Sequence, residues 1–203
     1  LPPGAHHIMP YRGVLRGVLA SLPDLARTRQ PLGHIEGLDL QGANRMLGAT
    51  TDATSTNPTE GPSLAQGSTK RSANLAPLPV AVWQCGMEYS ELSERFDMLE
   101  FDMSQDVEGF EADIVPDIVK EGLCDVLVTW MEWHLVESDA DEFVISGAPA
   151  SNGGPGSGGL HAVKLLAGGA IHVLPGMASS KLQVHASFDA TDCEVDMQVF
   201  EVL

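Results

Sequence analysis

The sequence contains few of the cysteines that small secreted scaffolds and zinc ribbons require. Its 203 residues include three, Cys85, Cys124 and Cys193, and they stand far apart. A disulfide framework or a zinc ribbon needs paired, closely spaced cysteines. We therefore expect reduced thiols that are buried as structural side chains, and a cytoplasmic or nuclear protein.

Long apolar runs are also missing. No stretch approaches the roughly 20 apolar residues that a membrane-spanning helix needs. The start at Leu1 has neither the basic region nor the apolar region of a signal peptide. We expect a protein without membrane contact. Since the first residue is not methionine, we also expect a piece of a longer polypeptide.

Positive charge is scarce, because 11 Lys and Arg residues stand against 28 Asp and Glu, which gives a formal net charge of −17. Between Glu88 and Glu142 there are 18 acidic residues, against only Arg95 and Lys120. Such a charge repels nucleic acid and attracts cationic partners such as Arg- or Lys-rich protein tails. A solubilising surface has the same composition. We expect no nucleic-acid partner, and the choice between these two roles stays open.

The patterns that are present indicate β-strands. Apolar and acidic residues alternate over 99–103, and residues 125–135 are rich in β-branched and aromatic side chains. Two late segments, 182–188 and 193–199, alternate and are separated by a short turn, which predicts a hairpin. These patterns predict one all-β domain over residues 1–203, an antiparallel β-barrel or sandwich with little helix.

Four other segments complete this picture. Residues 6–20 are expected to form one or two strands bent at Gly13 and Gly17, and residues 35–40 could pair with them. Residues 49–77 are poor in large apolar side chains, which predicts a disordered insertion. The Gly-rich segment 151–159 lacks the Lys-Ser/Thr ending of a phosphate-binding loop and precedes a strand pattern, so we expect a flexible loop.

No spacing of residues predicts a catalytic centre. The seven histidines include no His-x-His pair, so a metal-dependent barrel enzyme of the cupin kind lacks clustered ligands. No Ser lies in a Gly-x-Ser-x-Gly turn, and Cys124 has no neighbouring base. We therefore assign no catalytic, cofactor-binding or metal-binding residue to this chain.

The most distinctive segment is Trp130-Met-Glu-Trp-His134. On a strand, Trp130, Glu132 and His134 share one face, and Met131 and Trp133 share the other. One interpretation is a β core with a hydrogen-bonded polar rim. The other is a carboxylate presented to a guanidinium-bearing ligand, which a carboxylate can bind through two hydrogen bonds.

Several segments resemble the second module of the two-module, type III protein arginine methyltransferases. The resemblance covers residues 3–48 and 79–138, and from Leu160 onward only the strand pattern supports it. The segments that carry it are 3–10, 35–40, 79–85, 92–103 and 124–135.

This resemblance implies the carboxy-terminal β-barrel of that family. The S-adenosylmethionine site would lie in an upstream Rossmann-like domain that is absent from this chain, so we expect the chain to bind no cofactor. The family's Thr-His-Trp loop corresponds to a degenerate segment containing Gly158, Gly159 and His161. With Glu132 and His134, these are our candidates for a substrate-side rim.

The implied partners are the upstream methyltransferase module of the same polypeptide and Arg-rich protein substrates. The implied role of this chain is structural completion of an enzyme whose chemistry occurs elsewhere. The alternative is a free-standing, non-catalytic acidic β-barrel that binds Arg- and Lys-rich peptides.

Overall fold

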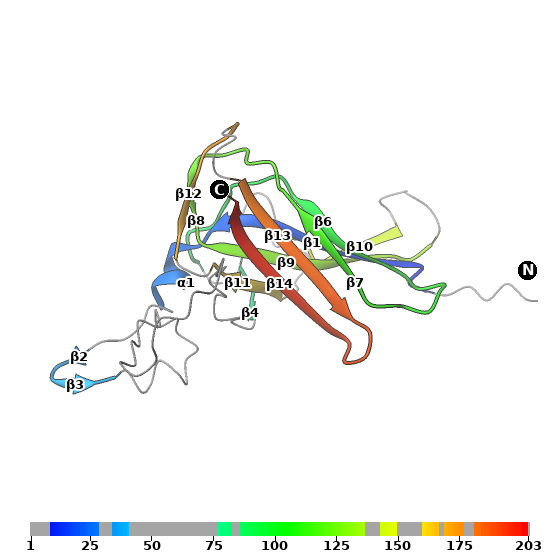
Figure 1. The fold of residues 1–203 in the computed structure, drawn as a ribbon, viewed down its shortest axis with the longest axis horizontal. Helices are drawn as coiled ribbons and strands as arrows, with labels where there is room; N and C mark the ends of the chain where they lie inside the picture. Colours follow the sequence, from blue (N-terminus) through cyan, green and yellow to red (C-terminus); the bar gives the residue numbers. More distant parts are fainter. Residues whose placement is uncertain are drawn as a thin grey trace, which may run out of the picture.

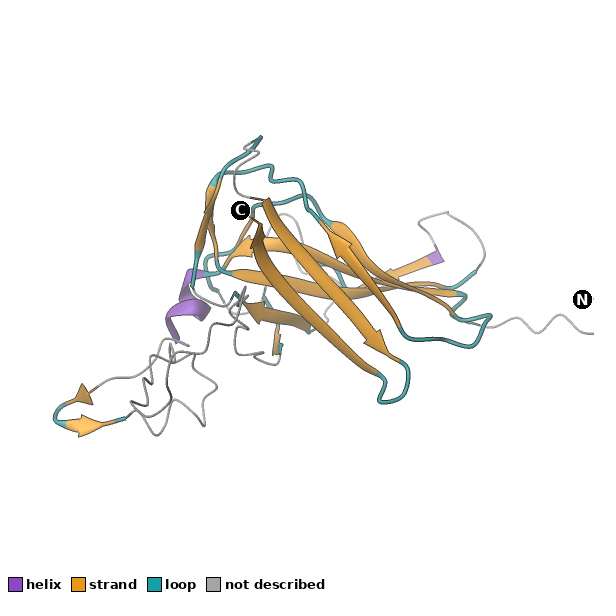
Figure 2. Cartoon of the chain, in the orientation of Figure 1, coloured by secondary structure: helices purple, strands orange, loops and turns teal. Residues whose placement is uncertain are grey.

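A computed structural model of the chain describes residues 9–28, 34–40, 77–82, 86–136, 143–149, 160–166, 169–176 and 181–202. Strands dominate these residues, and α1 (Pro23–Thr28) is the α-helix among them (Figure 2). No helix in this part of the chain has the length and apolar character needed to cross a membrane. The predicted 49–77 insertion, apart from Pro77, and the whole 151–159 loop lie outside the described residues.

The largest sheet has seven strands, and β1 and β9 form its centre. Its members are β1 (Arg12–Ser21), β4 (Leu78–Val80), β5 (Ser90–Glu91), β6 (Phe96–Asp102), β9 (Val126–His134), β10 (Val144–Ser146) and β11 (His161–Leu165). The strand β1 pairs antiparallel with β9 over nearly its full length, and it also pairs with β6 and β5. These pairings place the long strand predicted at 125–135 next to the first strand of the domain.

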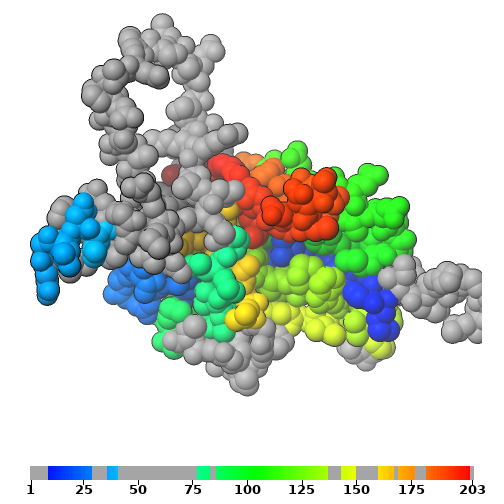
Figure 3. All heavy atoms as spheres, turned by 90° about the horizontal axis from the view of Figure 1, so that it is seen from below, coloured from blue at the N-terminus to red at the C-terminus, as the bar shows by residue number. Residues whose placement is uncertain are grey.

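Three smaller sheets accompany it (Figure 1). One contains β7 (Phe110–Ile114), β13 (Lys181–Asp189) and β14 (Glu194–Val202); the others pair β8 (Gly122–Cys124) with β12 (Ile171–Val173), and β2 (His34–Ile35) with β3 (Leu38–Asp39). In the space-filling view the β13–β14 hairpin, orange and red, lies beside the green β7 segment (Figure 3). All strand pairs are antiparallel, as predicted, but the described strands do not close into a barrel.

Two apolar cores cover the two faces of β1. On one face Leu15 and Leu19 join a core that extends to Leu182 and Val184 of the β13 sheet. On the other face Val18 joins a second core with residues of β9, β11 and α1. A strand buried on both faces is apolar along most of its length, and for this reason β1 does not show simple alternation.

The first segment forms one strand, and Gly13 and Gly17 both lie within its regular pairing with β9. A Cβ atom on Gly17 would lie 2.6 Å from the Met98 sulfur, and one on Gly13 would lie 2.7 Å from the Trp133 ring. These glycines make room for large neighbours. The irregularity lies instead in the pairing with β6, whose register shifts between Leu15 and Arg16.

The prediction that residues 35–40 pair with the first strand is also wrong. They belong to the β2–β3 hairpin, which Figure 1 places away from the large sheet. Its turn has positive φ angles at Glu36 (50°) and Gly37 (84°). Two successive positive φ angles are typical of the tight turns that suit the twist of a two-stranded ribbon.

The two described cysteines differ in burial. Cys124 is fully buried, as expected, and burial raises the pKa of its thiol to about 12. Cys193 is exposed in the β13–β14 turn, so the expectation that it is buried is wrong. Its φ of 55° lies in the left-handed region that turns use, and the turn residues around it are exposed. Cys85 lies outside the described residues.

Candidate functional site

Polar side chains gather at one end of the sheet, on the face that carries the second core. Alternation along the two central strands places Arg12 and Arg16 of β1 on this face. The same rule places Trp130, Glu132 and His134 of β9 beside them. The predicted shared face of these three β9 residues is therefore confirmed.

Glu132 is a largely buried carboxylate of this face, and its side chain is 12% exposed. Its Oε2 accepts a hydrogen bond from Arg16 Nη1 at 3.0 Å. Its Oε1 accepts hydrogen bonds from Ser146 Oγ at 2.6 Å and Trp130 Nε1 at 3.3 Å. Glu132 thus does bind a guanidinium, and that guanidinium belongs to its own chain.

A second guanidinium, that of Arg95, lies over the Trp130 ring at 5.3 Å from the centroid. It donates hydrogen bonds to Glu91 Oε1 at 2.7 Å and to the Pro149 carbonyl at 2.8 Å. The hydrogen bond with Glu91 raises the pKa of Arg95. Tyr89 donates to the same Glu91 carboxylate at 3.1 Å, and burial raises its pKa. The indole of Trp130 is therefore held between a carboxylate and a cation, which favours one fixed orientation of its ring.

The other predicted rim residues occupy different surroundings. His134 lies at the edge of the face, with its Nε2 3.3 Å from Arg12 Nη2. His161, on β11, is 1% exposed, and its Nδ1 lies 3.2 Å from the Val80 carbonyl oxygen. This contact assigns the ring proton to Nδ1. Gly158 and Gly159 lie outside the described residues.

Burial lowers the pKa of His161, and the backbone acceptors Val80 and Gly147 oppose that shift only in part. The unfolded chain binds a proton at histidine near pH 6.5. Since the folded pKa is lower, the stability that neutral His161 contributes is present above pH 6.5. It is lost as the pH falls through the folded pKa.

We expect the His161→Gln variant to lose less stability than the wild type when the pH is lowered from 7 to 5. The difference between the two slopes should be at most about 1.4 kcal/mol per pH unit, the value for one proton. Urea denaturation at several pH values measures it. Because His134, His172 and His185 remain in both proteins, the comparison isolates His161. Parallel slopes would contradict a lowered pKa.

Residues that sequence reasoning missed complete this face. Arg16, Arg95 and Ser146 supply the donors that surround Glu132 and Trp130. A signal for Arg16 was available, since it interrupts an otherwise apolar strand that also carries Arg12 at the same-face spacing. Among the described residues, no group of three or more His, Cys, Asp or Glu side chains is placed to hold a metal ion.

Comparison with curated proteins finds plant relatives. The chain is 34% identical over 143 residues to protein arginine N-methyltransferase 1.6 of Arabidopsis thaliana, a match that covers 70% of this chain and 17% of that protein. It is 28% identical over 188 residues to protein arginine N-methyltransferase 7 of Oryza sativa subsp. indica, covering 93% of this chain and 22% of that protein. The chain therefore spans about a fifth of the length of the curated relatives it matches. No protein-family model matches the chain.

Among solved structures, the chain is similar to the Trypanosoma brucei PRMT1 enzyme–prozyme heterotetrameric complex with AdoHcy. The TM-score is 0.59 at 10% identity, and the match covers 96% of this chain and 57% of that one. At this identity the likeness shows a shared fold. It agrees with the antiparallel β architecture predicted from the sequence.

Proposed function

Because this chain is a relative, in sequence and in fold, of the protein arginine N-methyltransferases, we propose that it forms the carboxy-terminal β module of such an enzyme. The complete polypeptide transfers a methyl group from S-adenosylmethionine to an arginine ω-nitrogen of a protein substrate. This module supplies structure and a substrate-side surface, and the upstream module carries out the chemistry. Cytoplasm and nucleus, where cysteine thiols stay reduced, are the proposed locations.

The observation that supports the structural role is that Glu132 accepts hydrogen bonds from residues of its own chain. A carboxylate that grips a substrate guanidinium must offer free oxygen atoms to it. Both oxygens of Glu132 already accept hydrogen bonds from this chain, one of them from Arg16. These contacts favour a structural role for Glu132 within its own chain, and the rim at His134 and Arg12 lies beside it.

The described residues do not fit S-adenosylmethionine. In the open α/β folds that bind nucleotide-like cofactors, the cofactor lies at the carboxyl ends of parallel strands, where a Gly-rich turn leads into a helix. The strand pairs described here are antiparallel, and α1, which follows β1, has six residues. We therefore assign no step of the methyl transfer to these residues. We propose that donor binding and catalysis belong to the preceding part of the polypeptide.

We expect the complete native polypeptide to methylate an Arg-rich protein when it is supplied with labelled S-adenosylmethionine, and residues 1–203 alone to give no label above the blank. The physical reason is that positioning of donor and acceptor supplies most of the rate, and this chain holds only one side of that arrangement. Isothermal titration of the donor into the chain serves as the control. Micromolar binding to residues 1–203 would contradict the proposal.

The acidic surface favours a second candidate, a free-standing module that binds Arg- and Lys-rich peptides. Glu111 and Asp113 of β7 are exposed beside β13, in a chain of net charge −17. Immunoblotting of the native protein with an antibody against residues 92–135 separates the two candidates. A band several times larger than 21.5 kDa supports the enzyme module, and a band at 21.5 kDa supports the free-standing module.

A further inference from the structure

The β13–β14 hairpin covers one face of the large sheet. Figure 1 shows the hairpin, in orange and red, lying across that sheet. Its buried side chains belong to the first core, together with residues of β1, β6 and β9; they are Leu182, Val184, Ala186 and Met197. No described strand of the large sheet pairs with β13 or β14. Contacts between side chains therefore hold the hairpin on the sheet.

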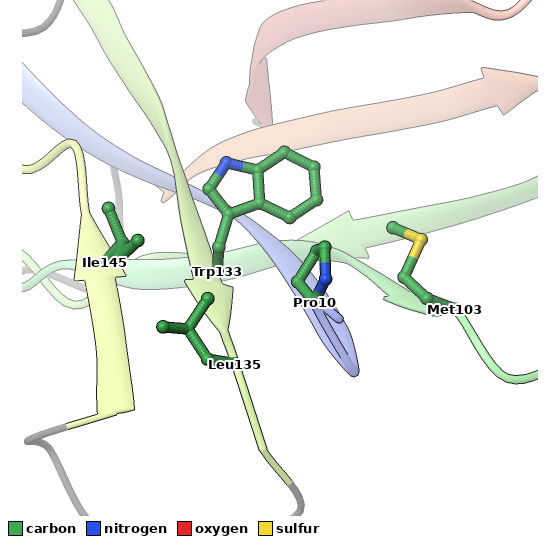
Figure 4. Close-up of a pocket in the computed structure, with 5 residues that line it drawn as sticks. All are labelled: Pro10, Met103, Trp133, Leu135 and Ile145. Carbon is green, nitrogen blue, oxygen red and sulfur yellow. The ribbon is translucent and has the colours of Figure 1, made fainter. Parts of the chain in front are cut away.

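The first core also borders an open groove at the end of β9. The volume of the groove is about 460 Å³, and Figure 4 shows the side chains that line it: Pro10, Met103, Trp133, Leu135 and Ile145. None of these residues belongs to the hairpin, and Met103 also packs against the first core. The position of the hairpin therefore determines how much of this apolar face is exposed to water.

Aromatic rings attach one side of the three-stranded sheet. Phe101 of β6 contacts Phe110 of β7 and Phe188 of β13, with ring centroids 5.4 and 5.2 Å from its own. The strand β14 has no part in this cluster, because it is the outer strand on the side of its sheet opposite β7. Any attachment of β14 to the large sheet is therefore separate from the aromatic cluster.

Lys164 of β11 supplies such an attachment. It lies opposite Leu127 of β9, so the two side chains share the face that carries the first core. Lys164 is only 7% exposed, and lysine is almost never buried to this degree without a charged partner. Its Nζ lies 3.6 Å from Oδ1 of Asp196 on β14. This ion pair joins the large sheet to the strand that the aromatic cluster does not reach.

The two side chains of this ion pair differ in exposure. The Lys164 side chain is 9% exposed, whereas that of Asp196 is 40% exposed. Burial lowers the pKa of Lys164, and Asp196 opposes that shift. Gln198 Nε2 donates a hydrogen bond to the other carboxylate oxygen, Asp196 Oδ2, at 2.9 Å. The buried ammonium group thus depends on a carboxylate that cations in solution can also reach.

We propose that the Lys164–Asp196 ion pair is an ionic latch, which holds the β13–β14 hairpin closed over the large sheet and is loosened by cations that compete for Asp196. Opening of the latch uncovers part of the first core, while the aromatic cluster keeps β7 and β13 attached. A local opening of this kind requires less free energy than global unfolding. The hairpin therefore moves as a flap that is hinged on its β7 side.

Hydrogen–deuterium exchange of β14 in the complete native polypeptide tests the latch. Asp196→Asn preserves the shape of the side chain but leaves the Lys164 ammonium group buried without its charged partner. We expect the β14 amides of this variant to exchange about tenfold faster, whereas the amides of β1 and β9 keep their wild-type rates. The Lys164→Met/Asp196→Asn double variant removes both charges. Its β14 exchange should return to within about threefold of the wild-type rate.

Salt gives a second measurement of the same latch, because ions in solution screen exposed charges. Raising the NaCl concentration from about 0.05 to 0.5 M should accelerate the exchange of wild-type β14 by about threefold. The double variant has neither charge of the latch, and its β14 exchange should not respond to salt.

The matched control is Glu194→Gln. Glu194 is an exposed acid on the same face of β14 as Asp196, and the substitution removes the same charge. The β14 amides of this variant should exchange at the wild-type rate. The control thus separates the ion pair with Lys164 from the general effect of removing an acid from this strand.

Three results would overturn the latch. The first is wild-type exchange of β14 in Asp196→Asn. The second is equal acceleration of β9 and β14, since the substitution would then lower global stability and open no flap. The third is a double variant that exchanges as fast as Asp196→Asn, because the lost carboxylate would then act without Lys164. Exchange of wild-type β14 that does not respond to salt would overturn the role of competing cations.

Discussion

Phe101→Ala is expected to lower the free energy of unfolding by about 3–5 kcal/mol, the usual cost of removing a large aromatic side chain from a core. Phe101 is 9% exposed on β6. Its ring meets Phe110 and Phe188 edge-on, with centroids 5.4 and 5.2 Å away. Phe110 and Phe188 belong to the β7–β13–β14 sheet, so truncation weakens the contact between two sheets. Urea denaturation followed by tryptophan fluorescence measures the loss.

Phe200→Ala is the matched control, because Phe200 is 39% exposed on β14. It removes the same atoms from a site near solvent and should cost about 1 kcal/mol or less. A similar loss of stability in both variants would mean that the position of the Phe side chain, buried or exposed, does not determine its contribution. It would contradict the role given to the Phe101–Phe110–Phe188 cluster.

Glu132→Ala is expected to lower the free energy of unfolding by about 2–3 kcal/mol. Removing one partner of a buried ion pair leaves the other charge uncompensated, which costs about 3–5 kcal/mol when both are fully buried. The estimate is lower here because the Arg16 side chain is 34% exposed and retains Asp97 as a partner. Trp130 Nε1 and Ser146 Oγ also lose their acceptor. The same denaturation experiment measures the change.

Glu100→Ala provides the comparison, since Glu100 also pairs with an arginine of β1. Its contact with Arg12 is 3.3 Å long, and the two side chains are 61% and 31% exposed. An exposed pair of this kind contributes about 0–1 kcal/mol. Glu132→Gln should fall between the two alanine variants, because the amide keeps an acceptor but not the charge. Equal losses for Glu132→Ala and Glu100→Ala would refute the network around Glu132.

The regular strands of this protein follow from local pattern. Alternation at Leu99 and Phe101 predicts β6, since exposed acids separate the buried residues. The same rule predicts the β13–β14 hairpin, whose register runs from Lys181–Val202 to Asp189–Glu194. These elements are predictable because each has one buried face, and a period of two is visible within a few residues.

The sequence does not predict features that depend on residues far away along the chain. Gly17 resembles a bend only until Met98 and Phe96, which fill the space above it, are placed on the paired strand. Residues 35–40 have the composition of a strand, but composition does not determine which strand pairs with which. In the structure β2 pairs with β3. The strand patterns also do not reveal whether the sheets close on one another, which depends on how the separate sheets pack.

The candidate site is also predictable from the sequence only in part. That Glu132 and Trp130 share a face is predictable from β9 alone. Arg16 can be placed on one face of β1 from its spacing, but its pairing with Glu132, and the position of Arg95 over Trp130, depend on which segments pack together and cannot be predicted from β9 alone. The substrate-side role of Glu132, His134 and His161 stays a prediction, and Gly158 and Gly159 lie outside the described residues.

The central place of β1 has a consequence for how the chain is made. β1 ends at Ser21, whereas β9, its longest partner, begins only at Val126. During synthesis β1 therefore leaves the ribosome long before β9, the strand that pairs with it, has been made. Pairings between strands so distant in sequence form slowly, because a long loop must close first. In that interval its two apolar faces, destined for two different cores, are accessible to chaperones or to other chains.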